Sequence, residues 1–200
     1  MPATLDALLA LLLFVLVATI SPGGATTLAT ASGANFGWQR SLPLLFGISL
    51  GLATMAAAAA AGLGALIVAV PALQLAMKLI GSVYLLWLAL QLARRGAPGK
   101  ANTAQRPARF FTGVWLLWQN PKAWAMTLSA AASFAALTPN PATLALLLGL
   151  VFALFSLISL ALWCVAGLML ARALKTDRQW RVLNVCLAAL LVASIVPIWR

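Results

Sequence analysis

Two short polar motifs interrupt long apolar stretches of the chain: Ser21-Pro22-Gly23 near the N-terminus and Asn120-Pro121-Lys122 in the second half. Ser and Asn are preferred N-cap residues, and Pro is favoured at the first position of a helix. Each motif therefore predicts that one helix stops and a new half-helix begins inside an apolar stretch. The N–H groups at such a start carry partial positive charge, which suits a carboxylate ligand.

The residues at the two breaks are the candidate substrate-binding residues. Glycines leave the backbone of the first break open to a ligand, and a threonine hydroxyl follows one helical turn later. A lysine this deep in an apolar stretch costs about 2.5–3.5 kcal/mol on insertion scales, so such residues usually face a cavity or a partner. The predicted binding set is Ser21, Pro22, Gly23, Gly24, Thr26, Asn120, Pro121 and Lys122. The alternative is that the prolines only kink packed helices and that Lys122 snorkels.

The composition places these motifs in a membrane protein. Of 200 residues, 64% are hydrophobic and 8% are charged, and the apolar stretches exceed the roughly 20 residues that cross a bilayer. The net charge of +11 comes from Lys and Arg in short loops, which the positive-inside rule explains better than nucleic-acid binding does. The chain has no His, and its two Cys lie apart in apolar stretches. We therefore expect no enzyme activity, no metal site and no cofactor.

Charged segments divide the chain into six predicted transmembrane helices. The first ends before Arg40, and two more lie between Arg40 and Arg94, with a turn near Val70-Pro71. After a basic loop over about 94–109, two helices follow with a turn at Thr138-Pro139-Asn140-Pro141. The sixth helix is predicted from about Val182 to Trp199. The alternative is five helices with a re-entrant segment.

Six helices divide into two sets of three, repeat A at about 1–93 and repeat B at about 110–200, within a single transporter domain over 1–200. Because three is odd, the second set enters the membrane with the opposite orientation, which gives an inverted 3+3 repeat. The breaks at Ser21-Pro22 and Asn120-Pro121 then lie in equivalent helices, 1 and 4. The basic loops predict a cytoplasmic face for the loops that carry them and an outside location for both termini.

The motifs together resemble signatures of the lysine exporter (LysE/RhtB) family of amino-acid efflux proteins. The resemblance covers nearly the whole chain in the expected order. It implies a bacterial inner-membrane exporter of amino acids or their derivatives, driven by the proton-motive force. The matching residues are Ser21-Pro22-Gly23 with Gly37, Gly47 and Gly51, then Lys78-x-x-Gly81-x-x-Tyr84-Leu85, Asn120-Pro121-Lys122-Ala123 and Trp180-Arg181-x-x-Asn184.

The chain departs from the family pattern at two positions. Gly24 stands where the family usually has Pro, and Leu52 stands where an acidic residue is frequent. Asp6 and Asp177 are the only acidic residues, and both lie outside the predicted span centres. Proton relays in membranes normally use carboxylates or His, so Lys122 and Lys78 are the candidate coupling residues.

Two other functions remain open from the residues alone. A metal-ion exporter of the same superfamily would need carboxylate or imidazole ligands, which the spans lack. A non-transporting membrane scaffold or assembly factor would leave the two breaks and Lys122 unexplained. The expected partners are an amino acid, the lipid bilayer and no nucleic acid, and Gly47-x-x-x-Gly51 could serve either a homo-oligomer or the fold.

Overall fold

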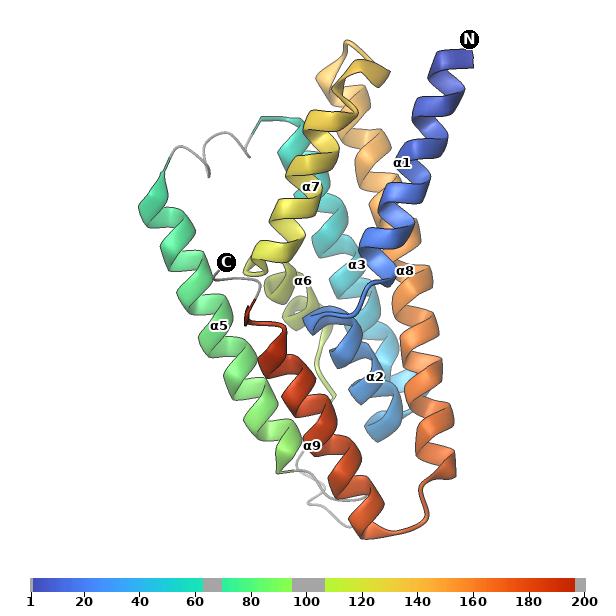
Figure 1. Cartoon of the computed structure of the whole chain (residues 1–200), viewed down its shortest axis with the longest axis vertical. Coiled ribbons are helices and arrows are strands. Elements are labelled where there is room, and N and C mark those ends of the chain that lie inside the picture. Colours follow the sequence, from blue (N-terminus) through green and yellow to red (C-terminus); the bar gives the residue numbers. More distant parts are fainter. Residues whose placement is uncertain (1, 63–69, 95–106, 197–200) are drawn as a thin grey trace.

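A computed structural model describes residues 2–62, 70–94 and 107–196, and all regular structure in these residues is helical. The all-α class is thereby confirmed for this part of the chain. A helix pairs its own backbone groups, as an apolar environment requires. The elements are α1 (Pro2–Ile20), α2 (Gly24–Phe36), α3 (Trp38–Ala60), α5 (Pro71–Ala93), α6 (Phe110–Trp118), α7 (Pro121–Ser133), the 3-10 helix η1 (Ala135–Leu137), α8 (Pro141–Ala173) and α9 (Asp177–Ala193) (Figure 1).

Two described helices, α3 and α8, are long and apolar enough to cross a membrane by themselves. The pair α1 and α2 passes the same test as one span bent by 57° at the first predicted break. The second predicted break is also present, because α6 ends at Trp118 and α7 begins at Pro121. Six spans in an inverted repeat stay a prediction.

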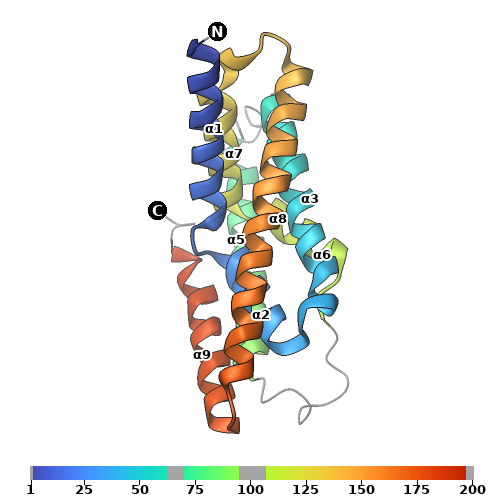
Figure 2. The ribbon, with the colours of Figure 1, turned by 90° about the vertical axis from the view of Figure 1, so that its right-hand side faces the viewer.

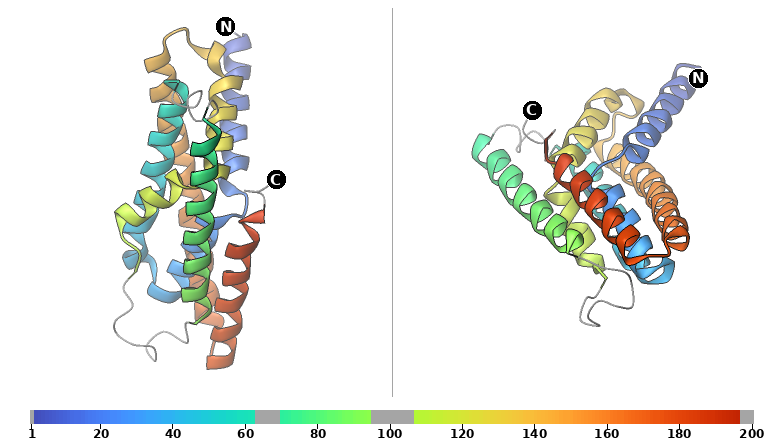
Figure 3. Two further views of the ribbon diagram at one scale, coloured as in Figure 1. Left: turned by 90° about the vertical axis from the view of Figure 1, so that its left-hand side faces the viewer. Right: turned by 60° about the horizontal axis from the view of Figure 1, so that its bottom comes forward.

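The longest helix, α8, runs along most of the molecule beside α1 and α2, and α3 packs on it (Figures 1 and 2). Their shared core contains Leu11, Ile48, Leu117 and Phe152, all buried. The helices α5 and α9 lie side by side on one flank (Figure 3), and Leu85 and Leu191 pack there with Ala31 of α2. Leu117 and Ala123, on either side of the second break, both belong to the core shared with α8.

Glycines bring helix backbones into contact at the end of the molecule where α2 ends and α6 begins. A Cβ on Gly33 would clash with the carbonyl of Cys164 in α8, and one on Gly167 would clash with the carbonyl of Thr30 in α2. Likewise, a Cβ on Gly47 of α3 would clash with the Phe110 carbonyl. Small residues allow close backbone approach between helices. Gly47 therefore serves packing within this chain.

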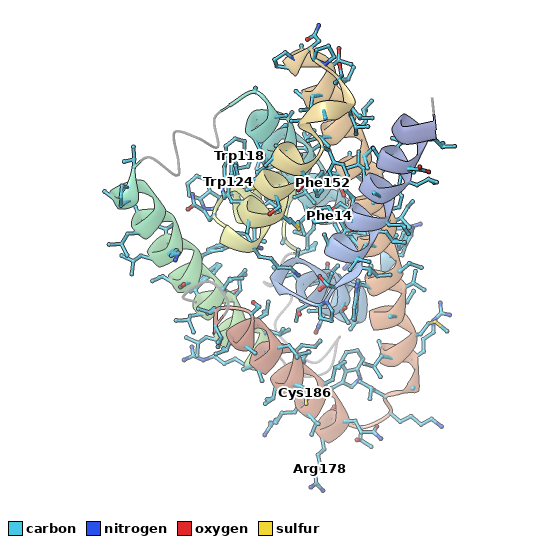
Figure 4. All side chains as sticks on the ribbon, turned by 45° about the horizontal axis from the view of Figure 1, so that its top comes forward. Phe14, Trp118, Trp124, Phe152, Arg178 and Cys186 are labelled. Carbon is cyan, nitrogen blue, oxygen red and sulfur yellow. The ribbon has the colours of Figure 1, made fainter. Side chains whose placement is uncertain are left out.

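The same end carries a cluster of exposed basic side chains at the ends of helices, which we call the basic end. Arg178 extends away from the bundle there (Figure 4). Its described members are Arg40, Arg94, Arg109, Arg172, Lys175, Arg178 and Arg181.

The start predicted for the sixth helix was wrong. The helix α9 begins five residues earlier, at Asp177, because the Thr176 hydroxyl accepts the Gln179 N–H and the Gln179 side chain accepts the Thr176 N–H. This reciprocal cap starts the helix among charged residues. It ends at Ala193, and the predicted end at Trp199 lies outside the described residues.

Candidate functional site

The first break occupies residues 21–23, but it is not capped as the sequence predicted. The N-cap of α2 is Gly23, not Ser21. The Ser21 hydroxyl instead donates to the Ala18 carbonyl at 2.9 Å, which ends α1. The Gly23 N–H donates to Thr26 Oγ1 at 2.8 Å, so the threonine closes the first turn of α2. Pro22 therefore lies in the connection and is exposed.

Side chains of α8 satisfy the carbonyl end of α1. Ser159 Oγ donates to the Thr19 carbonyl at 2.8 Å, and Trp163 Nε1 donates to the Ile20 carbonyl at 3.2 Å. The last carbonyls of a helix have no partner within that helix, and the end carries partial negative charge. A helix end that stops inside the protein therefore depends on a neighbouring helix for its hydrogen bonds.

Lys122 of α7 donates hydrogen bonds to the residues that directly follow the end of α1. Its ammonium group donates to Ser21 Oγ at 2.9 Å, to the Pro22 carbonyl at 3.3 Å and to the Ser21 carbonyl at 3.4 Å. An ammonium has three N–H donors, and the negative end of a helix favours a cation. The lysine of the second break is thus bound to the first break, although they are a hundred residues apart.

The second break is capped within its own two helices, as the sequence predicted. Asn120 is the N-cap of α7, and its side chain accepts the Lys122 N–H at 3.0 Å. Trp124 Nε1 donates to the Trp118 carbonyl at the end of α6, at 3.0 Å. The two indole rings meet edge to face with centroids 5.4 Å apart (Figure 4). This second break needs no other helix to satisfy these groups.

A small cavity of ≈ 40 Å³ joins the two breaks. It can hold a few water molecules and is smaller than the pockets that hold ligands. Apolar side chains such as Ile48, Leu52 and Met126 form much of its wall. The predicted residues that line it are Ser21, Gly23, Gly24, Thr26, Asn120 and Lys122. Pro22 is not among its lining residues, and neither is Lys78.

The first turn of α2 presents backbone donors to this cavity. Gly24 and Ala25 line it, and their N–H groups make no hydrogen bond within the described part of the chain. The first N–H groups of a helix have no partner within it and attract anions. The carbonyl end of α1, which favours a cation, and the N–H end of α2, which suits an anion, are therefore separated by three residues.

Residues of α8 are functional candidates that sequence reasoning missed. Ser156 lines the cavity, and Ser159 and Trp163 hold the end of α1. Their spacing of three and four residues puts them on one face of a helix. Polar groups recurring at this spacing in an otherwise apolar helix were the available signal.

Comparison with known proteins adds the family. The model of the LysE type translocator family matches residues 16–194. A cysteine/O-acetylserine efflux protein of Klebsiella pneumoniae is 30% identical over 190 residues, which cover 94% of this chain and 95% of the relative. A protein of the same name from Salmonella choleraesuis is 28% identical over 188 residues, covering 93% and 94%. An uncharacterized membrane protein of Vibrio cholerae is 35% identical over 95 residues, 48% of this chain and 46% of its own. No solved structure matches the chain.

Proposed function

Because the chain belongs to the LysE-type translocator family, a family of transporters and not of enzymes, we propose that it exports amino acids or their derivatives across the bacterial inner membrane. The substrate binds between the two breaks and leaves by alternating access. The observation that carries this proposal is the contact of Lys122 with Ser21 and Pro22. It joins the two helix breaks into one site that carries a positive charge and borders a cavity. Paired broken helices commonly form substrate sites in secondary transporters.

The substrate carboxylate is held at the starts of the two half-helices α2 and α7. Gly24 and Ala25 offer N–H groups at the first, and Lys122 offers a positive charge at the second. The chain has only two acidic residues, one near each end of the molecule, so no carboxylate of the protein competes for this charge. Oriented N–H groups together with a cation favour a bound anion.

The cavity wall favours a neutral, small or weakly polar side chain on the substrate. Ile48, Leu52 and Met126 supply apolar surface, and Thr19 and Ser156 supply hydroxyls. The relatives are named for export of cysteine and O-acetylserine, and both compounds have side chains of this kind. We extend these two substrates to this chain as the first to test.

The same proposal includes the membrane arrangement. Six crossings form the inverted repeat, with α1 and α2 as one bent span and α6 and α7 as another. The basic end faces the cytoplasm and both termini face the outside, because positive charge is retained on the cytoplasmic side. Lys122 is the stronger candidate for coupling, since it lines the cavity and Lys78 does not. A Lys122→Gln variant that still transports with unchanged proton flux would remove it from that role.

An export assay tests the function. Purified protein in vesicles loaded with a panel of amino acids, O-acetylserine and divalent metals is expected to release cysteine or O-acetylserine faster than vesicles without protein. Lys122→Ala is expected to lose at least about 90% of that release, a deficit of about 1.4 kcal/mol or more. Selective release of metals would favour a metal-ion exporter, and release of nothing would favour a scaffold. Intact export by correctly inserted Pro121→Ala and Lys122→Ala proteins would show that the proposed site is wrong.

A further inference from the structure

The environment of the Lys122 ammonium resembles what the ammonium group of an amino acid would need. Its partners are one hydroxyl and two carbonyl oxygens, at 2.9, 3.3 and 3.4 Å. No acidic residue of the chain lies at the cavity. A substrate ammonium in this cavity must therefore be bound by neutral oxygens. The Ser21 and Pro22 oxygens provide them, and they directly follow the end of α1, where the helix dipole favours a cation.

Resting on the function proposed above, we propose that Lys122 occupies the ammonium subsite of the empty carrier. The substrate ammonium displaces the Lys122 ammonium from Ser21 and Pro22. Lys122 then pairs with the substrate carboxylate, which lies at the start of α2. The substrate ammonium thereby replaces the Lys122 ammonium in the subsite. The site also gains one ion pair, between Lys122 and the substrate carboxylate.

The geometry around Lys122 favours such an exchange. Two of its three contacts are longer than the usual 2.9–3.0 Å of N–H···O hydrogen bonds, so they are weaker than the contact with the Ser21 hydroxyl. A Cβ on Gly23 would lie only 3.2 Å from the lysine nitrogen. The glycine therefore leaves room beside the ammonium, on the side that faces the first turn of α2.

The exchange also sets the substrate class. A compound with an ammonium but no carboxylate would displace Lys122 and leave that second cation without a partner. A compound with a carboxylate but no ammonium would leave Lys122 bound to Ser21 and Pro22. The lysine could then form only a weak ion pair with that carboxylate. The site is therefore selective for zwitterions with a free α-ammonium group.

Three small thiols separate these cases: cysteine, cysteamine, which lacks the carboxylate, and 3-mercaptopropanoate, which lacks the ammonium. Their dissociation constants are measured with the full-length protein in detergent by titration calorimetry under reducing conditions. We expect the parent protein to bind cysteine at least about tenfold more tightly than either analogue, since each loses one charge-assisted contact.

The Lys122→Met variant keeps an unbranched side chain that is one atom shorter and removes its charge. It is expected to bind cysteine more weakly and cysteamine more tightly, so that the ratio of the cysteamine dissociation constant to the cysteine dissociation constant falls well below that of the parent. Lys122→Arg is expected to keep the preference for cysteine. Lys175→Met, a matched lysine substitution between α8 and α9, is expected to leave all three constants unchanged. Lys122→Arg controls for a change of side chain at the same position. If the ratio of dissociation constants falls in Lys122→Met but not in Lys122→Arg, the positive charge at position 122 is responsible for the preference for cysteine.

A ratio in Lys122→Met equal to that of the parent would overturn the exchange. So would tight binding of 3-mercaptopropanoate to the parent, because it would show that binding needs no ammonium at the Ser21 and Pro22 oxygens. Either result, with cysteine still bound and exported, refutes this inference and leaves the transport function standing. A parent protein that neither binds nor exports any amino acid of the panel refutes the transport function, and the exchange with it.

Discussion

The two helix breaks look equivalent in the sequence, but they are held in different ways. The second is held by its own residues, with Asn120 capping α7 and Trp124 capping the end of α6. The first is held by distant residues, since Ser159 and Trp163 donate to the last carbonyls of α1 and Lys122 donates to Ser21. One break is locally determined, and the other depends on the packing of α7 and α8.

This difference assigns different roles to the two breaks. A self-capped break is a fixed support, and it presents Lys122 at a defined depth. A break whose carbonyls are satisfied by other helices changes when those helices or a ligand move, because its hydrogen bonds are made across the site. We therefore expect the substrate to act on the first break and the second to remain in place.

The largest effect on stability is expected where a glycine faces the fixed break. A Cβ on Gly81 of α5 would clash with the backbone carbonyl of Gln119, whereas one on Gly23 would meet only the flexible end of Lys122 at 3.2 Å. Gly81→Ala is expected to destabilise the protein by about 1–3 kcal/mol, the range for overpacked sites. Gly23→Ala should fold normally, because its backbone is extended, and should impair export.

Melting temperatures of the two purified proteins in detergent test this contrast. The Gly81→Ala protein should melt well below the parent and the Gly23→Ala protein close to it. Equal melting temperatures for all three would mean that the second break is as adaptable as the first.

The next effect concerns the dependence of the first break on α8. Ser159→Ala removes the donor to the buried Thr19 carbonyl, and a buried group without a partner costs about 1–3 kcal/mol. We expect lower thermal stability and slower export of cysteine from vesicles. Ser129→Ala, on the exposed face of α7, is the control and should change neither. If Ser159→Ala behaves like Ser129→Ala, the end of α1 does not need α8.

A smaller effect should distinguish the polar residues of the two breaks. Asn120→Ala removes a true N-cap, which is expected to cost about 1 kcal/mol. Ser21→Ala removes no cap, since Gly23 has that place, and the stability change should stay within about 0.5 kcal/mol. Its effect should appear in export, because Lys122 loses its shortest contact. Thermal unfolding and vesicle export of both variants are the measurements. A Ser21→Ala protein that is less stable than the Asn120→Ala protein would contradict the comparison.

The differences between the breaks explain which parts of the site the sequence could predict. Asn120 and Pro121 were placed correctly because capping depends on neighbouring residues. The prediction that Ser21 caps α2 is wrong, because the group that closes α2 is the hydroxyl of Thr26, three residues after the actual N-cap, Gly23. The local sequence pattern alone cannot decide which of two nearby hydroxyls, that of Ser21 or that of Thr26, closes the first turn of α2.

The remaining parts of the site depend on tertiary contacts. The cost of a buried charge marked Lys122 as functional, but its partners are mostly backbone carbonyls, which have no sequence signature. The all-helical fold followed from apolar length and could be predicted. The start of α9 could not be placed from charge, because its first turns contain Arg178 and Arg181, and a basic segment between apolar stretches predicts a loop.

The claim that the two breaks form one site is tested most directly by a double-mutant cycle across them. The free energy of cysteine binding is measured for the parent, Ser21→Ala, Lys122→Met and the double variant, with Ser21→Ala and Lys78→Met as the control cycle. We predict that the first cycle departs from additivity by more than about 0.5 kcal/mol and that the control cycle does not. Additive effects of Ser21→Ala and Lys122→Met would contradict a shared site.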